Sequence, residues 1–97
     1  MQHLQRRRPN APRPGQTLNV EIVPENRNPI PTALRQTDVK TNAIVSKTSL
    51  IGQAGAGVGI LTVQGPAGVY RLDVEIPDPK VANRYTIIPG PYVTVTP

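Results

Sequence analysis

The sequence has no cysteine, tryptophan or phenylalanine, and three tyrosines are its only aromatic residues. Without cysteine, neither disulfides nor a cysteine-based zinc site can stabilise this chain of 97 residues. Because large aromatic rings bury the most surface per residue, a core without Phe or Trp is thin. Below about 70–80 residues a single core rarely supplies more than about 3–5 kcal/mol. We therefore expect the protein to gain stability by association, either as a homo-oligomer or symmetric array or with a larger partner.

Histidine and long apolar runs are also scarce. The single histidine, His3, lies in a segment that we expect to be disordered, so no Ser–His–Asp or Cys–His set can be assembled. No metal-ligand spacing is present, and we predict a protein that is not an enzyme, with no catalytic residue, cofactor or metal. No apolar run approaches the ~20 residues of a membrane helix, and none follows the N-terminal arginines as in a secretory signal. We expect a protein that is neither secreted nor bound to a membrane.

The first sixteen residues differ from the rest of the chain. Three prolines fix the backbone toward extended geometry, and Leu4 is the only sizeable apolar residue after Met1. Such a segment cannot bury enough apolar surface to fold alone. We predict that residues 1–16 form a flexible basic arm and that residues 17–97 form the folded domain. Four arginines, with no acid, give the arm +4 of the formal net charge of +5: Arg6, Arg7, Arg8 and Arg13.

From residue 17 the apolar residues follow a period of two, which is typical of half-buried strands. The first run ends at Pro24, residues 24–32 are predicted to be a loop, and residues 33–38 are ambiguous. No segment has a helical period longer than a single turn, near residues 80–83 or 32–36. Prolines and glycines separate the short strands. This spacing predicts an all-β fold, a small antiparallel Ig-like β-sandwich or a small barrel. The further strands are predicted over residues 39–48, 60–64, 69–76, 84–88 and 92–96.

The clearest strand, residues 69–76, alternates strictly. Its apolar residues from Tyr70 to Ile76 face one way, and Arg71, Asp73 and Glu75 face the other. The two carboxylates could bind a cation, but Arg71 shares their face. We therefore favour a solvated face with cross-strand charge pairs.

Glycines gather in residues 52–59. Gly55, Gly57 and Gly59 give G-x-G-x-G, which lacks the spacing of the dinucleotide fingerprint, and no Lys-Ser/Thr follows as in a P-loop. A flexible connection or a hairpin tip is the physical alternative. With Ile51, Val58 and Ile60 nearby, a loop that becomes ordered against a partner is a less favoured interpretation.

Residues 68–95 resemble the last two strands of filamin-type immunoglobulin-like repeats. Those repeats end with a Gly-x-Tyr strand, here Gly68 and Tyr70, and a Pro-Gly-Ser-Pro-aromatic strand, here Pro89-Gly90-Pro91-Tyr92 without the serine. The resemblance implies an Ig-like sandwich and carries no actin-related function.

The arm has the most specific physical content. Guanidinium groups on an extended backbone can bind carboxylates or phosphates in bidentate fashion. Its target is therefore either an acidic protein surface or a nucleic acid, and a solvated tail without a target is the third interpretation. The folded part is nearly neutral, because the eleven basic residues less the arm's four leave seven against six acids. This balance favours the protein surface over nucleic acid.

A thin sandwich with an adhesive arm resembles the cement or decoration proteins of tailed-phage capsids. The resemblance implies a structural protein of the virion surface, whose arm clamps acidic grooves of a shell protein. The alternatives are a nucleic-acid-binding accessory protein and a tail-fibre or adhesin-like binding module. If the decoration interpretation fails, we expect a cytoplasmic location.

Overall fold

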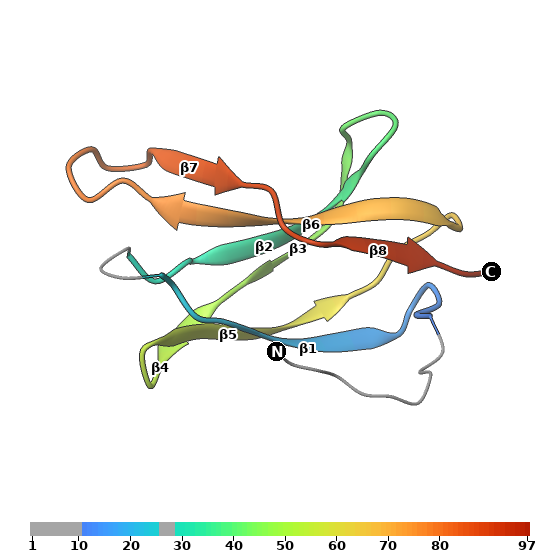
Figure 1. Cartoon of the computed structure of the whole chain (residues 1–97), viewed down its shortest axis with the longest axis horizontal. Helices are drawn as coiled ribbons and strands as arrows, with labels where there is room; N and C mark the ends of the chain where they lie inside the picture. The colour runs from blue at the N-terminus through green and yellow to red at the C-terminus, as the bar shows by residue number, and fades with distance from the viewer. Residues whose placement is uncertain (1–10, 26–28) are drawn as a thin grey trace.

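The computed structural model describes residues 11–25 and 29–97. These residues form eight strands (Figure 1) and include no helix that could cross a membrane. The strands are β1 (Thr17–Ile22), β2 (Ala33–Asp38), β3 (Ile44–Ser49), β4 (Ile51–Gln53), β5 (Ala56–Thr62), β6 (Gly68–Pro77), β7 (Tyr85–Ile88) and β8 (Tyr92–Val95).

The strands form two antiparallel sheets that pack face to face. Sheet A has the order β1-β5-β4, and sheet B has the order β3-β2-β6-β7. β8 also pairs with β6, beyond the end of β7, so that β7 and β8 share one edge of sheet B. Figure 1 shows β1, β5 and β4 along the bottom of the molecule and β6, β7 and β8 along the top. The predicted all-β antiparallel sandwich is confirmed.

β1 follows its sequence pattern. Leu18, Val20 and Ile22 are half-buried, and the residues between them are exposed. The inward side chains pack against both halves of the core, because Leu18 contacts the cluster around Tyr70 while Val20 and Ile22 contact the cluster around Leu34. Alternation alone therefore placed this strand and its buried face correctly.

β2 was left ambiguous by the sequence and is the central strand between β3 and β6. Its inward positions are Leu34 and Gln36, both fully buried. The Gln36 amide is satisfied by the backbone of Gln64, since Nε2 donates to the carbonyl at 2.9 Å and Oε1 accepts from the N–H at 3.0 Å. A buried polar side chain is tolerated in the core when both of its ends are bonded in this way.

The predicted strand over residues 39–48 is wrong for its first half. Residues 39–43 turn instead, because the Asp38 carboxylate accepts from the N–H groups of Lys40 and Thr41 and Asn42 takes a positive φ of 64°. An aspartate that bonds its own downstream backbone favours a turn over a strand. The strand proper begins at Ile44.

The glycine-rich segment is a hairpin tip with a strand on either side. Ala54 and Gly55 have φ values of 52° and 82°, which confirms the tip, but β5 already begins at Ala56. Here the chain passes from β3 in sheet B to β4 in sheet A at buried Leu50. A Cβ on Gly59 would lie 2.9 Å from both Leu50 Cδ2 and the Ser49 carbonyl oxygen. The absence of a side chain therefore lets the crossing strand lie close to β5.

Two apolar clusters fill the space between the sheets. Leu34, Leu50, Leu61 and Val74 form one of them, and Val63, Tyr70 and Val95 form the other. Tyr70 is the only aromatic residue among these buried side chains. The core is thus as thin as the composition predicted.

Candidate functional site

The arm is joined to the domain over its last six residues. In this anchored segment, residues 11–16, Gly15 N–H donates to the Val63 carbonyl at 2.7 Å and Val63 N–H donates to the Gln16 carbonyl at 2.8 Å. At the other end, Thr96 N–H donates to the Pro12 carbonyl at 2.9 Å. The anchored segment therefore bridges the ends of β5 and β8.

The four arginines proposed as the binding arm fall into two groups. Arg6, Arg7 and Arg8 lie outside the described residues. Arg13 lies in the anchored segment and is exposed, with its backbone in a turn closed by Gln16 N–H at 3.1 Å from the Arg13 carbonyl. Its guanidinium group is thus presented from a fixed piece of backbone.

The polar side of β6 carries a network of ion pairs. Arg71 Nε lies 2.6 Å from Asp73 Oδ1, and the Thr37 hydroxyl donates to Asp73 Oδ2 at 2.9 Å. Glu75 Oε2 lies 3.0 Å from Lys47 Nζ and 3.4 Å from Arg35 Nε. The predicted cross-strand charge pairs are confirmed, but the predicted solvated face is wrong. The side chains of Asp73 and Glu75 are only 4% and 8% exposed, because the longer basic side chains cover them.

The environment of Asp73 favours its ionised form. Burial acts to raise the pKa of this carboxyl group, but the hydrogen bonds from Arg71, Thr37 and the backbone of Gly90 outweigh it and hold the pKa below its usual value. The hydrogen bond with Asp73 in turn raises the pKa of Arg71. A carboxylate with a lowered pKa is a poor general base near neutral pH. This geometry suits a structural ion-pair network.

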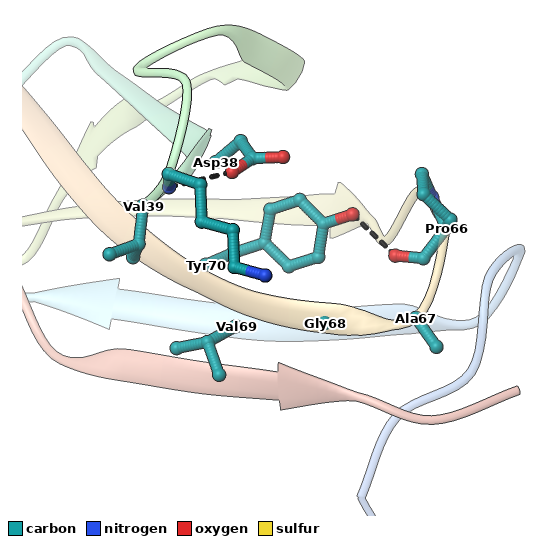
Figure 2. Close-up of a pocket in the computed structure, with 8 residues that line it drawn as sticks. Asp38, Val39, Pro66, Ala67, Gly68, Val69 and Tyr70 are labelled. Atoms are coloured by element: carbon teal, nitrogen blue, oxygen red, sulfur yellow. Dashed lines mark hydrogen bonds between the residues drawn. The ribbon is translucent and has the colours of Figure 1, made fainter.

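A cavity of about 590 Å³ opens beside the start of β6 (Figure 2). Its lining is mostly apolar or backbone, with Asp38 and Lys40 as its charged residues. The Tyr70 ring points along the cavity and its hydroxyl group donates to the Pro66 carbonyl. Such a tyrosine, bonded to the backbone a few residues upstream, is a feature of Greek-key sandwiches. Burial, and then the charge of Asp38, raises the pKa of Tyr70, so the hydroxyl group remains a donor.

Replacing Tyr70 by phenylalanine should lower the free energy of unfolding by about 1–2 kcal/mol, because the Pro66 carbonyl loses its donor. Urea denaturation at pH 7 measures this change. The matched control is Tyr85→Phe, since Tyr85 is 50% exposed. A loss for Tyr70→Phe no larger than for Tyr85→Phe would show that the hydroxyl group does not tie the turn to β6.

The outer face of sheet A carries an apolar patch formed by Ile51, Val58 and Ile60. Ile51 lies opposite Val58 in the β4–β5 register, and Ile60 follows two residues later on the same face. Ile51 is 71% exposed and Ile60 is 58% exposed. The sequence analysis expected Ile60 at the start of a strand but did not place Ile51 and Val58 on strands, whereas all three lie on paired strands. Contiguous exposed apolar side chains are typical of surfaces that bind another protein.

A groove runs along the free edge of β1 on the open side of the sandwich. One part, of about 250 Å³, is lined by residues 19–22 and by Leu34, Leu72, Val74 and Pro91. The other, of about 230 Å³, is lined by residues 22–25 and by Pro31, Val74, Ile76 and Ile88. The two parts share Ile22 and Val74, and so they form one continuous feature, called here the open groove. Its floor is mostly apolar.

Sequence reasoning did not identify the open groove, although two signals were present. Ile22 and Val23 are consecutive apolar residues, as are Ile87 and Ile88. Adjacent residues of an extended chain point to opposite faces, so each pair places one apolar side chain away from the core. Val23 is 69% exposed, and both members of the second pair are exposed, Ile87 by 38% on the outer face and Ile88 by 42% on the side of Val74.

No group of three or more His, Asp or Glu residues that could hold a metal ion occurs in residues 11–25 and 29–97. Comparison with known proteins adds no relative: no family model matches the sequence, and no curated protein or solved structure matches the chain.

Proposed function

We propose that this protein is a non-enzymatic assembly protein that attaches to a larger protein shell through its basic arm and its β domain, as a capsid decoration protein does. In this role Arg6, Arg7, Arg8 and Arg13 bind acidic grooves of the shell protein, and the domain contacts neighbouring copies. The protein then resides on the virion surface. The suggested likeness to filamin-type repeats concerns only the sandwich and adds no function.

The observation that carries the proposal is the distribution of apolar side chains. Among the described residues, ten large apolar side chains are exposed and nine apolar residues, two of them alanine, form the core. Several are contiguous, as in the patch of Ile51, Val58 and Ile60. A small sandwich with a thin core gains stability when such surface is covered, and assembly with other chains covers it.

The anchored segment supports the role given to the arm. Thr96 bonds to the carbonyl groups of Ala11 and Pro12 and fixes these residues against the domain. Arg8 precedes this fixed point by three residues, so the arginine cluster can reach only surfaces close to the end of β8. Restricting the reach of a charged tether raises its effective concentration at the nearby surface.

Shortening the chain should separate attachment from stability. Residues 11–97 keep every hydrogen bond of the anchored segment, and we expect their free energy of unfolding to equal that of the full chain. Residues 17–97 lose three backbone hydrogen bonds between the segment and the domain, which should cost about 2–3 kcal/mol. Urea denaturation of the three chains measures both differences. Equal stability of all three would show that the anchored segment contributes nothing to the fold.

Co-sedimentation with empty shells of the virus that carries this chain tests the function itself. We expect the full chain to pellet with the shells and residues 11–97 to remain in the supernatant. Arg6→Gln with Arg7→Gln should weaken attachment at least tenfold, a loss of about 1.4 kcal/mol. The matched control, Lys40→Gln with Lys80→Gln, removes the same charge from exposed sites outside the arm and should change little.

Binding to random-sequence DNA distinguishes the nucleic-acid alternative. Neutralising several phosphates makes the logarithm of the affinity fall steeply with the logarithm of the salt concentration. Tight DNA binding with such a slope, together with no attachment to shells, would refute the proposed function.

A further inference from the structure

The free edge of β1 has backbone groups without a strand partner. β1 pairs with β5 on one side, and no described residue pairs with its other side. Gln16 accepts from Val63 N–H on the β5 side, and alternate residues of an antiparallel strand direct their N–H and C=O groups to opposite sides. The backbone groups of Thr17, Asn19 and Glu21 therefore point away from β5. Such an edge is a template for another strand.

The open groove lies along this same edge. Four consecutive residues of β1, Asn19 to Ile22, line the groove. Consecutive residues belong to opposite faces of a strand, so all four can line the same groove only if the edge of β1 borders it. Val20 and Ile22 pack onto the cluster that contains Val74 of β6, so β1 lies over β6. β7, which flanks β6, thus extends beyond sheet A with no strand of residues 11–25 and 29–97 opposite it, whereas the end of β8 packs against Leu18 and the anchored segment. Within the described part of the chain, sheet A has no fourth strand opposite β7.

The chemistry of the open groove restricts what can fill it. The floor residues Val74, Ile76 and Ile88 require apolar side chains at alternate positions of the added strand. The opposite face of that strand would lie beside Glu21, and Glu25 lies at one end of the groove. Neither glutamate belongs to an ion pair of the described residues. A basic side chain opposite Glu21 would form a favourable cross-strand pair.

Two occupants from the chain itself fit poorly. Residues 1–10 contain only Met1 and Leu4 as apolar residues and have three consecutive arginines, so they cannot present an alternating apolar face. If β1 of a second copy filled the groove, β6 of the second copy would lie beneath that β1. The second copy's β6 would then need the space that β7 and β8 of the first copy already occupy.

We propose that an extended segment of a partner protein, in which apolar residues alternate with basic ones, docks along β1 as the fourth strand of sheet A. This proposal rests on the proposed function in one respect, that the partner protein belongs to the assembly to which this protein attaches. Main-chain hydrogen bonds to Thr17, Asn19 and Glu21 supply affinity, and the apolar floor selects the side chains. The basic residues of the segment pair with Glu21 and Glu25.

The test uses a short synthetic peptide in which valine alternates with lysine and threonine, and the full-length protein. On binding, amide hydrogen exchange followed by NMR should slow about tenfold or more at Thr17, Asn19 and Glu21. Leu18 and Val20, whose N–H groups already bond to β5, should change little. A peptide of the same composition with its valines grouped together should bind at least tenfold more weakly.

Two variants and one control assign the binding to the open groove. Asn19→Pro removes a donor from the free edge and leaves the β5 side bonded, and Ile88→Lys puts a charge on the groove floor. Each should weaken peptide binding at least tenfold, and either one suffices if the other fails to fold. Ile51→Lys, at an exposed position of β4 on the far edge of sheet A, should have no effect.

Three results would overturn the proposal. They are no binding of the alternating peptide, equal binding by both peptides, and binding that neither groove variant weakens. Slow exchange at Asn19 in the free full chain that becomes fast in residues 11–97 would also contradict it, because the arm would then fill the groove. Residues 11–97 should bind the peptide as the full chain does, so failure of shell attachment through the arm and failure of groove docking are separate results.

Discussion

Replacing Gly90 by alanine should cause the largest loss of stability of any single methyl group added to this protein, about 3 kcal/mol. Gly90 lies between Pro89 and Pro91 in the link from β7 to β8, which runs along the edge of β6. A Cβ at this position would overlap the carbonyl oxygen of Leu72. Leu72 belongs to the central strand and its N–H donates to the Pro91 carbonyl at 3.0 Å. Neither side can move without breaking the sheet.

Urea denaturation of Gly90→Ala beside Gly52→Ala measures this effect. A Cβ on Gly52 would meet Ile30 Cδ1 at an ordinary distance of 3.7 Å, so the control should change the free energy of unfolding by no more than about 0.5 kcal/mol. Equal stability of the two variants would show that the link does not lie against β6 as described.

Removing the Asp73 carboxylate should also cost about 3 kcal/mol at pH 7. Asp73→Ala leaves the Thr37 hydroxyl group and Arg71 Nε without their acceptor beside a carboxylate site that is only 4% exposed. The matched control is Glu25→Ala, because Glu25 is exposed and belongs to no ion pair of the described residues. A loss no larger than that of the control would show that the network does not stabilise the sheet.

The same carboxylate should make stability depend on acid. Its pKa in the folded state lies below the usual 3.8, so the unfolded chain takes up the proton first as the pH falls. The stabilisation from Asp73 is present above about pH 4 and is lost as the pH falls through the lowered pKa. The Asp73→Asn side chain does not titrate, so the difference in the free energy of unfolding between the wild type and this variant should shrink as the pH falls below about 4. A difference that stays constant over that range would contradict the lowered pKa.

The strands that sequence alone predicted well are those with uninterrupted alternation. β1 and β6 have apolar residues at every second position, and β8 is bounded by prolines, so period and breakers were sufficient. β2 was not recognised because Gln36 stands at an inward position. Its burial depends on the backbone of Gln64, which is distant in sequence. No local pattern could reveal that partner.

The same limit applies to the polar face of β6 and to the glycine-rich segment. The pairing of Asp73 and Glu75 with cations followed from residue types, but their burial required Arg35 and Lys47 from neighbouring strands. The glycines of β5 could be interpreted as a loop, because the close crossing at Leu50 is a tertiary contact. In both places the local composition suggested a solvent-exposed segment, whereas tertiary packing determined the structure.

One candidate surface could be predicted from the sequence and the other could not. The charge of the arm could be seen directly in the sequence. The open groove could not, because it depends on which strand lacks a neighbour, and that is a property of the sheet order. Consecutive apolar residues such as Ile22 and Val23 indicated surplus apolar surface without locating it.

Cleavage by trypsin after Arg6 and Arg7 tests most directly whether the arm is a tether that becomes fixed on a larger body. The cleavage rates, followed by mass spectrometry, are compared for the free chain and for the chain co-sedimented with empty shells. Binding of these side chains by the shell should slow cleavage at least tenfold. Unchanged rates on shells that do retain the protein would show that attachment occurs without the arginines.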